Sequence, residues 1–216
     1  MIIGEDFKWN KFMKRILILD FDGTIIDSNY VKENSIIEYI KDNYGINIFN
    51  LIDNFKFQSL TRYELINLAK KSPISLKEKK DIDLIINSKV TKARLDPFLL
   101  NLYKYCSKLK IKIYLVSNTP SESLKMIIDK LKISHYFYKI IGKKANLSKS
   151  NIFSQILKDE NVKPFNVLSV GDNIQDYFAS KINSIPFHGI YSNSLKEISN
   201  SIPTSFSLIG IIGSLY

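Results

Sequence analysis

The sequence has little cysteine, no long apolar run and no signal-peptide pattern. Cys106 is the single cysteine among 216 residues, so no disulfide can form within the chain. It falls in an apolar helical pattern, which indicates a core thiol rather than a nucleophile. No run approaches the ~18 consecutive apolar residues of a membrane-spanning helix, and residues 1–14 mix charged with apolar side chains. We therefore expect a soluble cytoplasmic protein without a membrane partner.

Acidic residues are the minority among the charges. There are 31 basic and 21 acidic residues, which gives a formal net charge of +10 at pH 7. Such an excess can attract nucleic acid or other anions. The lysines are scattered, however, and no long basic run is interleaved with aromatic residues. We expect solvated lysine faces and no nucleic-acid partner. Hydrophobic residues make up 45% of the chain, enough for a sizeable core.

Two aspartates follow the first strand-like segment. Residues 16–19 form a short continuous apolar run, typical of a strand buried on both faces. Directly after it come Asp20, Asp22, Gly23 and Thr24. Two carboxylates at a strand end suit a hard cation and a phosphoryl group. Taken alone, the same residues are also compatible with a turn in which glycine adopts a positive φ.

Strand-like patterns are absent from residues 25–95, where short amphipathic helices are predicted instead. Gly45 is a plausible helix C-cap, and capping-box patterns begin at Thr61 and Ser75. From Asp96 onward, helical and strand-like patterns alternate. We expect helices to begin at Asp96-Pro97 and Thr119-Pro120, and near residues 149 and 176. We expect strands at residues 111–116, 138–141, 167–170 and 186–191.

This order of elements predicts an α/β fold. We expect a doubly wound, Rossmann-like parallel sheet with an inserted all-α helical cap domain. Residues 1–24 and 96–216 would form the catalytic core, and residues 25–95 the cap. The tail, residues 201–216, is apolar enough to dock on the core as a helix.

Polar groups suited to a metal and a phosphate follow three of the expected strands. Ligands bind beyond the carboxyl ends of the strands in an open parallel sheet. Asp20 and Asp22 follow the first strand. Asp172, with Asp176 four residues later, follows the fourth. Four carboxylates in one crevice repel one another unless a cation is present, and Mg²⁺ fits oxygen ligands of this kind.

The remaining strand end offers groups for a phosphate. Ser117 and Asn118 follow the second strand at a predicted helix start, where a side chain and backbone N–H groups can hold phosphate oxygens. A lysine is also expected to neutralise the phosphate. Lys149 is placed before a helix so as to point towards the strand ends, and Lys143 and Lys144 are alternatives.

These motifs, in this order, resemble the four motifs of the haloacid dehalogenase superfamily. The resemblance spans residues 16 to about 191. The helical insert resembles the α-helical cap of the phosphoglycolate phosphatase and β-phosphoglucomutase-like branch. The chain departs from that branch at the third motif, because the common Lys-Pro pair is absent from residues 143–149.

The resemblance implies a role for each motif. Asp20 would be the nucleophile that forms an aspartyl-phosphate, and Asp22 the general acid and base. Mg²⁺ would be held by Asp20, the backbone carbonyl of Asp22 and Asp172, with Asp176 in support. The phosphoryl group and substrate would be bound by Ser117, Lys149, Thr24 and Asn118.

The helical insert is expected to choose the substrate. Residues 58–62 resemble the cap loop that reaches the distal part of the substrate in this branch. Arg62 would then pair with a carboxylate or a second phosphate. The alternative is an exposed arginine in a first helical turn.

The second aspartate favours phosphatase over dehalogenase chemistry, because phosphate-ester cleavage needs a proton for the leaving oxygen. The leading hypothesis is a Mg²⁺-dependent phosphatase that hydrolyses a small phosphorylated metabolite. A phosphomutase and a non-catalytic binding module are alternatives. The sequence leaves the substrate and the oligomeric state open.

Overall fold

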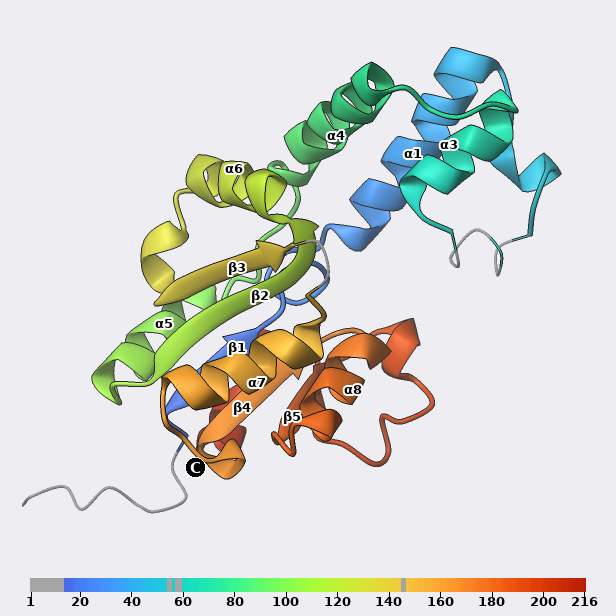
Figure 1. Ribbon diagram of the computed structural model, residues 1–216. Helices are drawn as coiled ribbons and strands as arrows, with labels where there is room; N and C mark the ends of the chain where they lie inside the picture. Colours follow the sequence, from blue (N-terminus) through green and yellow to red (C-terminus); the bar gives the residue numbers. More distant parts are fainter. Residues whose placement is uncertain (1–13, 54–55, 57–59, 145–146) are drawn as a thin grey trace, which may run out of the picture.

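A single parallel sheet forms the centre of the molecule (Figure 1). The computed structural model describes residues 14–53, 56, 60–144 and 147–216. The strands are β1 (Ile16–Leu19), β2 (Lys112–Pro120), β3 (Lys139–Lys143), β4 (Val167–Gly171), β5 (Phe187–Ile190) and β6 (Thr204–Ser205). Their order is β3-β2-β1-β4-β5-β6, and every neighbouring pair is parallel. The predicted Rossmann-like α/β fold is confirmed.

Helices cover both faces of the sheet. They are α5 (Leu99–Lys108), α6 (Ser121–Leu131), α7 (Lys149–Asp159) and α8 (Ile174–Ile182). Leu17 and Leu19 of β1 pack with the apolar side chains of α5 and α6. Ile16 and Ile18 point to the opposite face and pack with α7 and α8. Alternation along β1 therefore places two helices on each side, as the continuous apolar run predicts.

Further helices lie beyond the carboxyl ends of β2 and β3 (Figure 1). They are α1 (Asn29–Tyr44), the 3-10 helix η1 (Ile48–Asn50), α3 (Arg62–Lys70) and α4 (Leu76–Val90). The predicted left-handed C-cap at Gly45 and the capping boxes at Thr61 and Ser75 are confirmed. Helix α1 packs against both α3 and α4. The division into a core and a cap at residues 24/25 and 95/96 stays a prediction.

Two connections, hydrogen-bonded to each other, join these helices to the sheet. Ile26 forms an antiparallel bridge with Leu95. On either side of it, Asp27 N–H donates to the carbonyl of residue 94 at 2.9 Å, and Asp96 N–H donates to the carbonyl of Ile25 at 2.8 Å. The chain therefore leaves and re-enters the core through a short paired ribbon close to the end of β1.

Two predicted helix starts are wrong by about two residues. Strand β2 continues to Pro120, which pairs with Lys143 of β3, so α6 begins only at Ser121. At the other start, Asp96 Oδ1 accepts a hydrogen bond from Phe98 N at 2.8 Å. This turn precedes α5, which begins at Leu99. Proline fixes φ but does not decide whether a helix follows at once.

The tail docks on the core, but it contains an extra strand. Residues 204–205 form β6, which the sequence analysis did not predict, and Leu208–Leu215 form a 3-10 helix, η5, rather than an α-helix. Leu208, Ile211 and Leu215 are fully buried. Cys106 is also buried, as predicted. Of the helices that the structure describes, none has the length and apolar character needed to cross a membrane.

Candidate active site

Three aspartates and one lysine form a buried group at the carboxyl ends of β1 and β4. The Lys149 ammonium lies 2.5 Å from Asp20 Oδ1 and 2.5 Å from Asp176 Oδ1. Carboxylate oxygens of Asp20, Asp172 and Asp176 lie within 4.8 Å of one another. All four side chains are buried. This group is termed the core cluster below.

Regular structure positions each member of the core cluster. Asp20 continues β1, and its N–H donates to the carbonyl of Val170 at 2.9 Å. Asp172 follows β4 directly. Asp176 lies in the first turn of α8, and Lys149 is the first residue of α7. Segments that are far apart in the sequence thus meet at one edge of the sheet, where open parallel sheets bind ligands.

Gly23 allows the loop after β1 to approach Asp172 closely. Its φ is +74°, in the left-handed region that favours glycine. A Cβ built at this position would lie 2.1 Å from Asp172 Oδ2. Any other residue at position 23 would therefore displace the carboxylate or the loop.

Burial and mutual repulsion control the pKa values of the core cluster. Burial raises the pKa of Asp20 well above its usual value, with Lys149 opposing this and the neighbouring aspartates adding to it. Burial and the charge of Asp176 raise the pKa of Asp172 to about 7. Burial alone would lower the pKa of Lys149, but its two carboxylate partners outweigh burial, so that pKa is raised and the amine stays charged.

The second aspartate of the motif has different partners. Asp22 Oδ1 accepts a hydrogen bond from Ser28 Oγ at 2.5 Å and lies 2.6 Å from Lys32 Nζ. Asp22 Oδ2 accepts one from Thr119 Oγ1 at 2.6 Å. Lys32 also donates to Thr119 Oγ1 at 3.1 Å. These four residues are termed the α1 cluster, because Ser28 and Lys32 come from the start of α1.

The α1 cluster shifts the pKa of Asp22 downward. Burial would raise this pKa, but the charge of Lys32 and hydrogen bonds from Lys32, Ser28 and Thr119 outweigh burial. Asp20 and Asp22, separated by one residue, therefore have pKa values shifted in opposite directions.

The first turn of α1 contacts both clusters. Ser28 occupies the N-cap position, yet its side chain makes no capping hydrogen bond and donates to Asp22 instead. A serine cap normally stabilises a helix by about 1 kcal/mol. The next residue, Asn29, donates from Nδ2 to Asp172 Oδ2 at 2.9 Å. Helix α1 thus gives up a cap and gains contacts with two carboxylates.

A cleft of about 150 Å³ lies over the core cluster. Its lining includes the predicted residues Asp20, Asp22, Asn118, Lys149, Asp172 and Asp176. Asn118 Nδ2 donates to Gln175 Oε1 at 3.2 Å across the cleft. Ser117 and Asn118 were predicted to follow the second strand at a helix start, but β2 continues to Pro120 and both lie within it. Ser117 is buried there, and its Oγ accepts a hydrogen bond from Thr119 N at 3.0 Å. The structure therefore gathers most of the predicted site at one place.

Two predicted substrate-binding residues lie elsewhere. Thr24 is buried beside the paired connections and lines a separate cavity of about 360 Å³. Arg62 pairs with Asp83 at 3.1 Å, between α3 and α4. Among the described residues, no hydrogen bond or ion pair joins Thr24 or Arg62 to either cluster. Gln58 and Ser59, of the proposed cap loop, lie outside the described residues.

Lys149 is the lysine that the structure brings to the carboxylates. Lys143 and Lys144 are exposed, and within the described part of the chain neither pairs with an aspartate of the clusters. Sequence reasoning missed the contacts of Ser28, Asn29, Lys32 and Thr119. The one available signal was helical spacing, since residues four apart, such as 28 and 32, share a helix face.

The carboxylates of Asp20, Asp172 and Asp176 fit a divalent cation. The two clusters together hold four carboxylates and two ammonium groups, which leaves two formal negative charges in a buried site. Oxygen ligands alone suit a hard cation. The side chain of Asp22 is not part of this group, since the α1 cluster holds it.

The fold and these carboxylates define a class of protein. Residues 17–190 match the family described as haloacid dehalogenase-like hydrolase. The chain belongs to this family, as the order of its motifs predicts. Comparison of the sequence with curated proteins gave no match.

Solved structures share the fold at low sequence identity. A HAD hydrolase of family IA, variant 3, from Entamoeba histolytica is 17% identical with a TM-score of 0.75, over 93% of this chain and 99% of that one. A predicted phosphoglycolate phosphatase from Haemophilus somnus is 16% identical with a TM-score of 0.68, over 91% and 96%. CbbY from Rhodobacter sphaeroides, solved in complex with phosphate, is 15% identical with a TM-score of 0.67, over 92% and 99%.

Proposed function

We propose that this protein is a Mg²⁺-dependent phosphatase that hydrolyses a small phosphorylated metabolite through an aspartyl-phosphate. Membership of a hydrolase family supports the reaction type. The phosphate bound to the similar CbbY structure supports a phosphorylated substrate. One observation carries the proposal: Asp20, paired with Lys149, and Asp22, held by the other members of the α1 cluster, lie one residue apart in the chain with separate partners.

Two carboxyl groups with different environments suit a nucleophile and an acid–base group. Asp20 Oδ1 is held by Lys149, whereas no hydrogen bond from the described residues reaches Asp20 Oδ2. Oδ2 is therefore the oxygen available to attack phosphorus. Asp22 is held separately by the α1 cluster, close enough in the chain to serve the same substrate.

In the first half of the reaction, Asp20 Oδ2 forms a bond to phosphorus and the bond to the ester oxygen breaks. The leaving alkoxide takes a proton from Asp22 and departs as the alcohol. Lys32 opposes protonation of Asp22 in the structure described here. We therefore expect Lys32 to move away from Asp22 when substrate binds.

In the second half, the ionised Asp22 removes a proton from water. The water oxygen bonds to phosphorus, and the bond from phosphorus to Asp20 breaks, which restores the Asp20 carboxylate and releases phosphate. Lys32 and Thr119 favour the ionised form of Asp22 and so support this half of the reaction.

Mg²⁺ would be held by Asp20, Asp172 and the backbone carbonyl of Asp22, with Asp176 in support. When bound, it supplies Lewis-acid stabilisation of the charge on the phosphoryl oxygens. The raised pKa values of Asp20 and Asp172 support such a site, because a cation would relieve their repulsion.

The remaining predicted residues would act on the substrate. Lys149 and Ser117 would bind phosphoryl oxygens, and Asn118 lines the cleft beside them. Arg62 would contact the distal part of the substrate only after leaving Asp83. The contact predicted for Thr24 would be made through its backbone, because its side chain is buried in another cavity.

The test is phosphate release from p-nitrophenyl phosphate and from a panel of sugar phosphates, phosphoglycolate and nucleotides, each with and without Mg²⁺. We expect release only with Mg²⁺, and its loss in Asp20→Asn. Asp42→Asn, an exposed site on α1, is the matched control and should keep full activity. A fully active Asp20→Asn variant would exclude the proposed nucleophile.

The same assay separates the alternatives. A phosphomutase would return the phosphoryl group to a sugar, so an isomerised sugar phosphate without free phosphate would favour that reaction. If no compound in the panel reacts and Mg²⁺ does not bind, a non-catalytic binding module would be the better description.

A further inference from the structure

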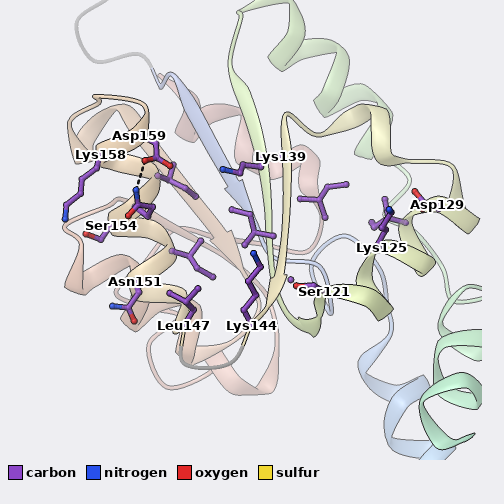
Figure 2. A pocket seen from close by; sticks show the side chains of 17 residues that line it. Ser121, Lys125, Asp129, Lys139, Lys144, Leu147, Asn151, Ser154, Lys158 and Asp159 are labelled. Carbon is purple, nitrogen blue, oxygen red and sulfur yellow. Dashed lines mark hydrogen bonds between the residues drawn. The ribbon is translucent and has the colours of Figure 1, made fainter. Parts of the chain in front are cut away.

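A second pocket, of about 900 Å³, lies at the β3 edge of the sheet (Figure 2). It lies between α6, which covers one face, and α7, which covers the other. Its apolar lining comes mainly from isoleucines: Ile128, Ile140, Ile141, Ile152 and Ile156. The cleft over the core cluster is about 150 Å³ and shares none of these lining residues. The pocket is therefore separate from the candidate active site.

Cationic side chains surround this apolar lining. Four lysines and two aspartates line the pocket: Lys125, Lys139, Lys144, Lys158, Asp129 and Asp159. In Figure 2 the side chain of Lys144 extends from the end of β3 back over the pocket. Within the described part of the chain, none of these six side chains has an ion-pair partner, and Asp159 accepts a hydrogen bond from the neutral Gln155 at 2.5 Å. The pocket thus combines apolar walls with a net positive lining, four lysines against two aspartates.

We propose that this pocket binds a small organic anion that has an apolar body. The isoleucine surface would cover the apolar body, and the lysines would attract the anionic group. A second copy of this chain that docked through the same pocket is a poor occupant, because the lysines of the two copies would repel each other. This binding does not depend on the proposed phosphatase activity.

The pocket shares structure with the candidate active site. Asn151 lines the pocket and forms a capping box with Ser148 at the start of α7, next to Lys149. Ser121 also lines it and follows the end of β2, two residues after Thr119. We therefore expect a bound anion to change turnover without competing with substrate. This expectation, unlike the binding itself, rests on the proposed function.

The probe for binding is 8-anilinonaphthalene-1-sulfonate, which has an aromatic body and one sulfonate and fluoresces more strongly in apolar surroundings. Titrations compare the unmodified protein with the double variant Lys125→Glu/Lys144→Glu. The control is Lys104→Glu, an exposed lysine on α5. We expect the double variant to bind at least about tenfold more weakly, and the control to bind as the unmodified protein does.

A third variant tests the cavity rather than the charge. Ser154→Trp, on the α7 wall, would place a large ring in part of the pocket without changing the net charge and should weaken binding. Circular dichroism checks that each variant is folded. Equal dye binding by the unmodified protein, the double variant and Ser154→Trp would overturn the proposal.

Displacement of the dye then identifies the anion. A fatty acid, a nucleotide and an acidic peptide are each added as competitors. Displacement by either small anion supports the proposal, and displacement by the peptide alone overturns it. The displacing compound is then added to the phosphate-release assay, where a change in kcat at saturating substrate is expected. Unchanged turnover would overturn the coupling, while the dye titration still reports on binding even if no phosphatase activity is found.

Discussion

Asp20 and Asp22 are almost adjacent in the sequence, but they belong to clusters that shift the pKa values of their aspartates in opposite directions. In the core cluster, burial and neighbouring carboxylates raise the pKa values of Asp20 and Asp172. In the α1 cluster, burial would raise the pKa of Asp22, but the charge of Lys32 and the hydrogen bonds from Lys32, Ser28 and Thr119 together lower it. The members of the core cluster come from β1, β4, α7 and α8, and α1 adds only the hydrogen bond from Asn29 to Asp172, whereas two of the four members of the α1 cluster come from the start of α1 itself.

One short motif therefore depends on two parts of the fold. The sheet fixes the carboxylates that suit a nucleophile and a metal, and it does so through strand ends. Helix α1 fixes the carboxylate that suits proton transfer. A change in the position of α1 would therefore affect the α1 cluster first.

Lys149→Met removes the ammonium that lies between Asp20 and Asp176. Breaking a buried ion pair in this way costs about 3–5 kcal/mol, and loss of the cation should lower turnover about 10²–10³-fold. Urea unfolding and phosphate release measure the two effects. Lys104→Met, exposed on α5, is the control. Unchanged stability together with unchanged turnover would contradict the role of the core cluster.

Asp22→Asn should reduce turnover of alkyl phosphates by about 10²–10⁴-fold, because it removes the acid and base. It leaves Asp20 intact, so p-nitrophenyl phosphate, whose leaving group needs little protonation, should still phosphorylate the protein. Mass spectrometry of the intact protein should then find the added phosphoryl group. The same experiment with Asp20→Asn should find none. If neither variant accumulates a phosphoryl group, the division of roles between the two aspartates is wrong.

The raised pKa of Asp172 predicts how stability depends on pH without a divalent cation. Its value in the folded protein, about 7, lies above the usual value of 3.8. The contribution of Asp172 to stability is therefore full below about pH 4 and lost as the pH rises towards 7. In EDTA, the melting temperature should fall over this range, and it should fall less in Asp172→Asn.

Mg²⁺ provides the matching measurement at pH 7. A ligand present at 100 times its dissociation constant stabilises the folded state by about 2.7 kcal/mol. We expect Mg²⁺ to stabilise the unmodified protein, seen as a higher melting temperature, and to raise the melting temperature of Asp172→Asn little or not at all. Asp42→Asn should behave as the unmodified protein does. Equal stabilisation of both aspartate variants would place the cation outside the core cluster.

Lys32→Met should have the smallest effect, and it acts on the α1 cluster alone. Without Lys32 the pKa of Asp22 rises, so the ionised base is lost at a higher pH. The acid limb of the kcat/KM profile, which reports the free enzyme in which Lys32 pairs with Asp22, should move upward by about one pH unit. Lys41→Met, exposed towards the far end of α1, should leave the profile unchanged. An unshifted acid limb in Lys32→Met would mean that Asp22 does not titrate in catalysis.

The core cluster could be predicted from the sequence because strand ends are readable. A continuous apolar run, such as residues 16–19, gives the strand, and the polar residue after it gives the site. Asp20, Asp172 and Asp176 were found in this way, and the structure brings them together. The parallel sheet was predicted by the same alternation of patterns, although β6 was not.

The α1 cluster could not be predicted in the same way. Ser28 has the features of an ordinary helix cap, and nothing in the apolar pattern of α1 shows that Lys32 turns back to the sheet. The partner of Arg62 was hidden for a related reason, since Asp83 lies on another helix and the packing of both α3 and α4 on α1 brings the two side chains together. Side-chain pairs between two helices or strands can be identified only from the three-dimensional structure, because the sequence pattern shows which face of each helix or strand is buried but not what packs against it.

Helix α1 is also a rod fixed at one end. Its 16 residues make it about 24 Å long. Its base holds the carboxylates of Asp22 and Asp172, and its shaft packs against α3 and α4. A tilt of roughly 10° about the base would move the far end by about 4 Å, by the geometry of a rod of this length. A small displacement at the carboxylates of Asp22 and Asp172 therefore corresponds to a larger displacement at the far end of α1. Conversely, a partner that moves the far end would change the position of the residues that contact these carboxylates.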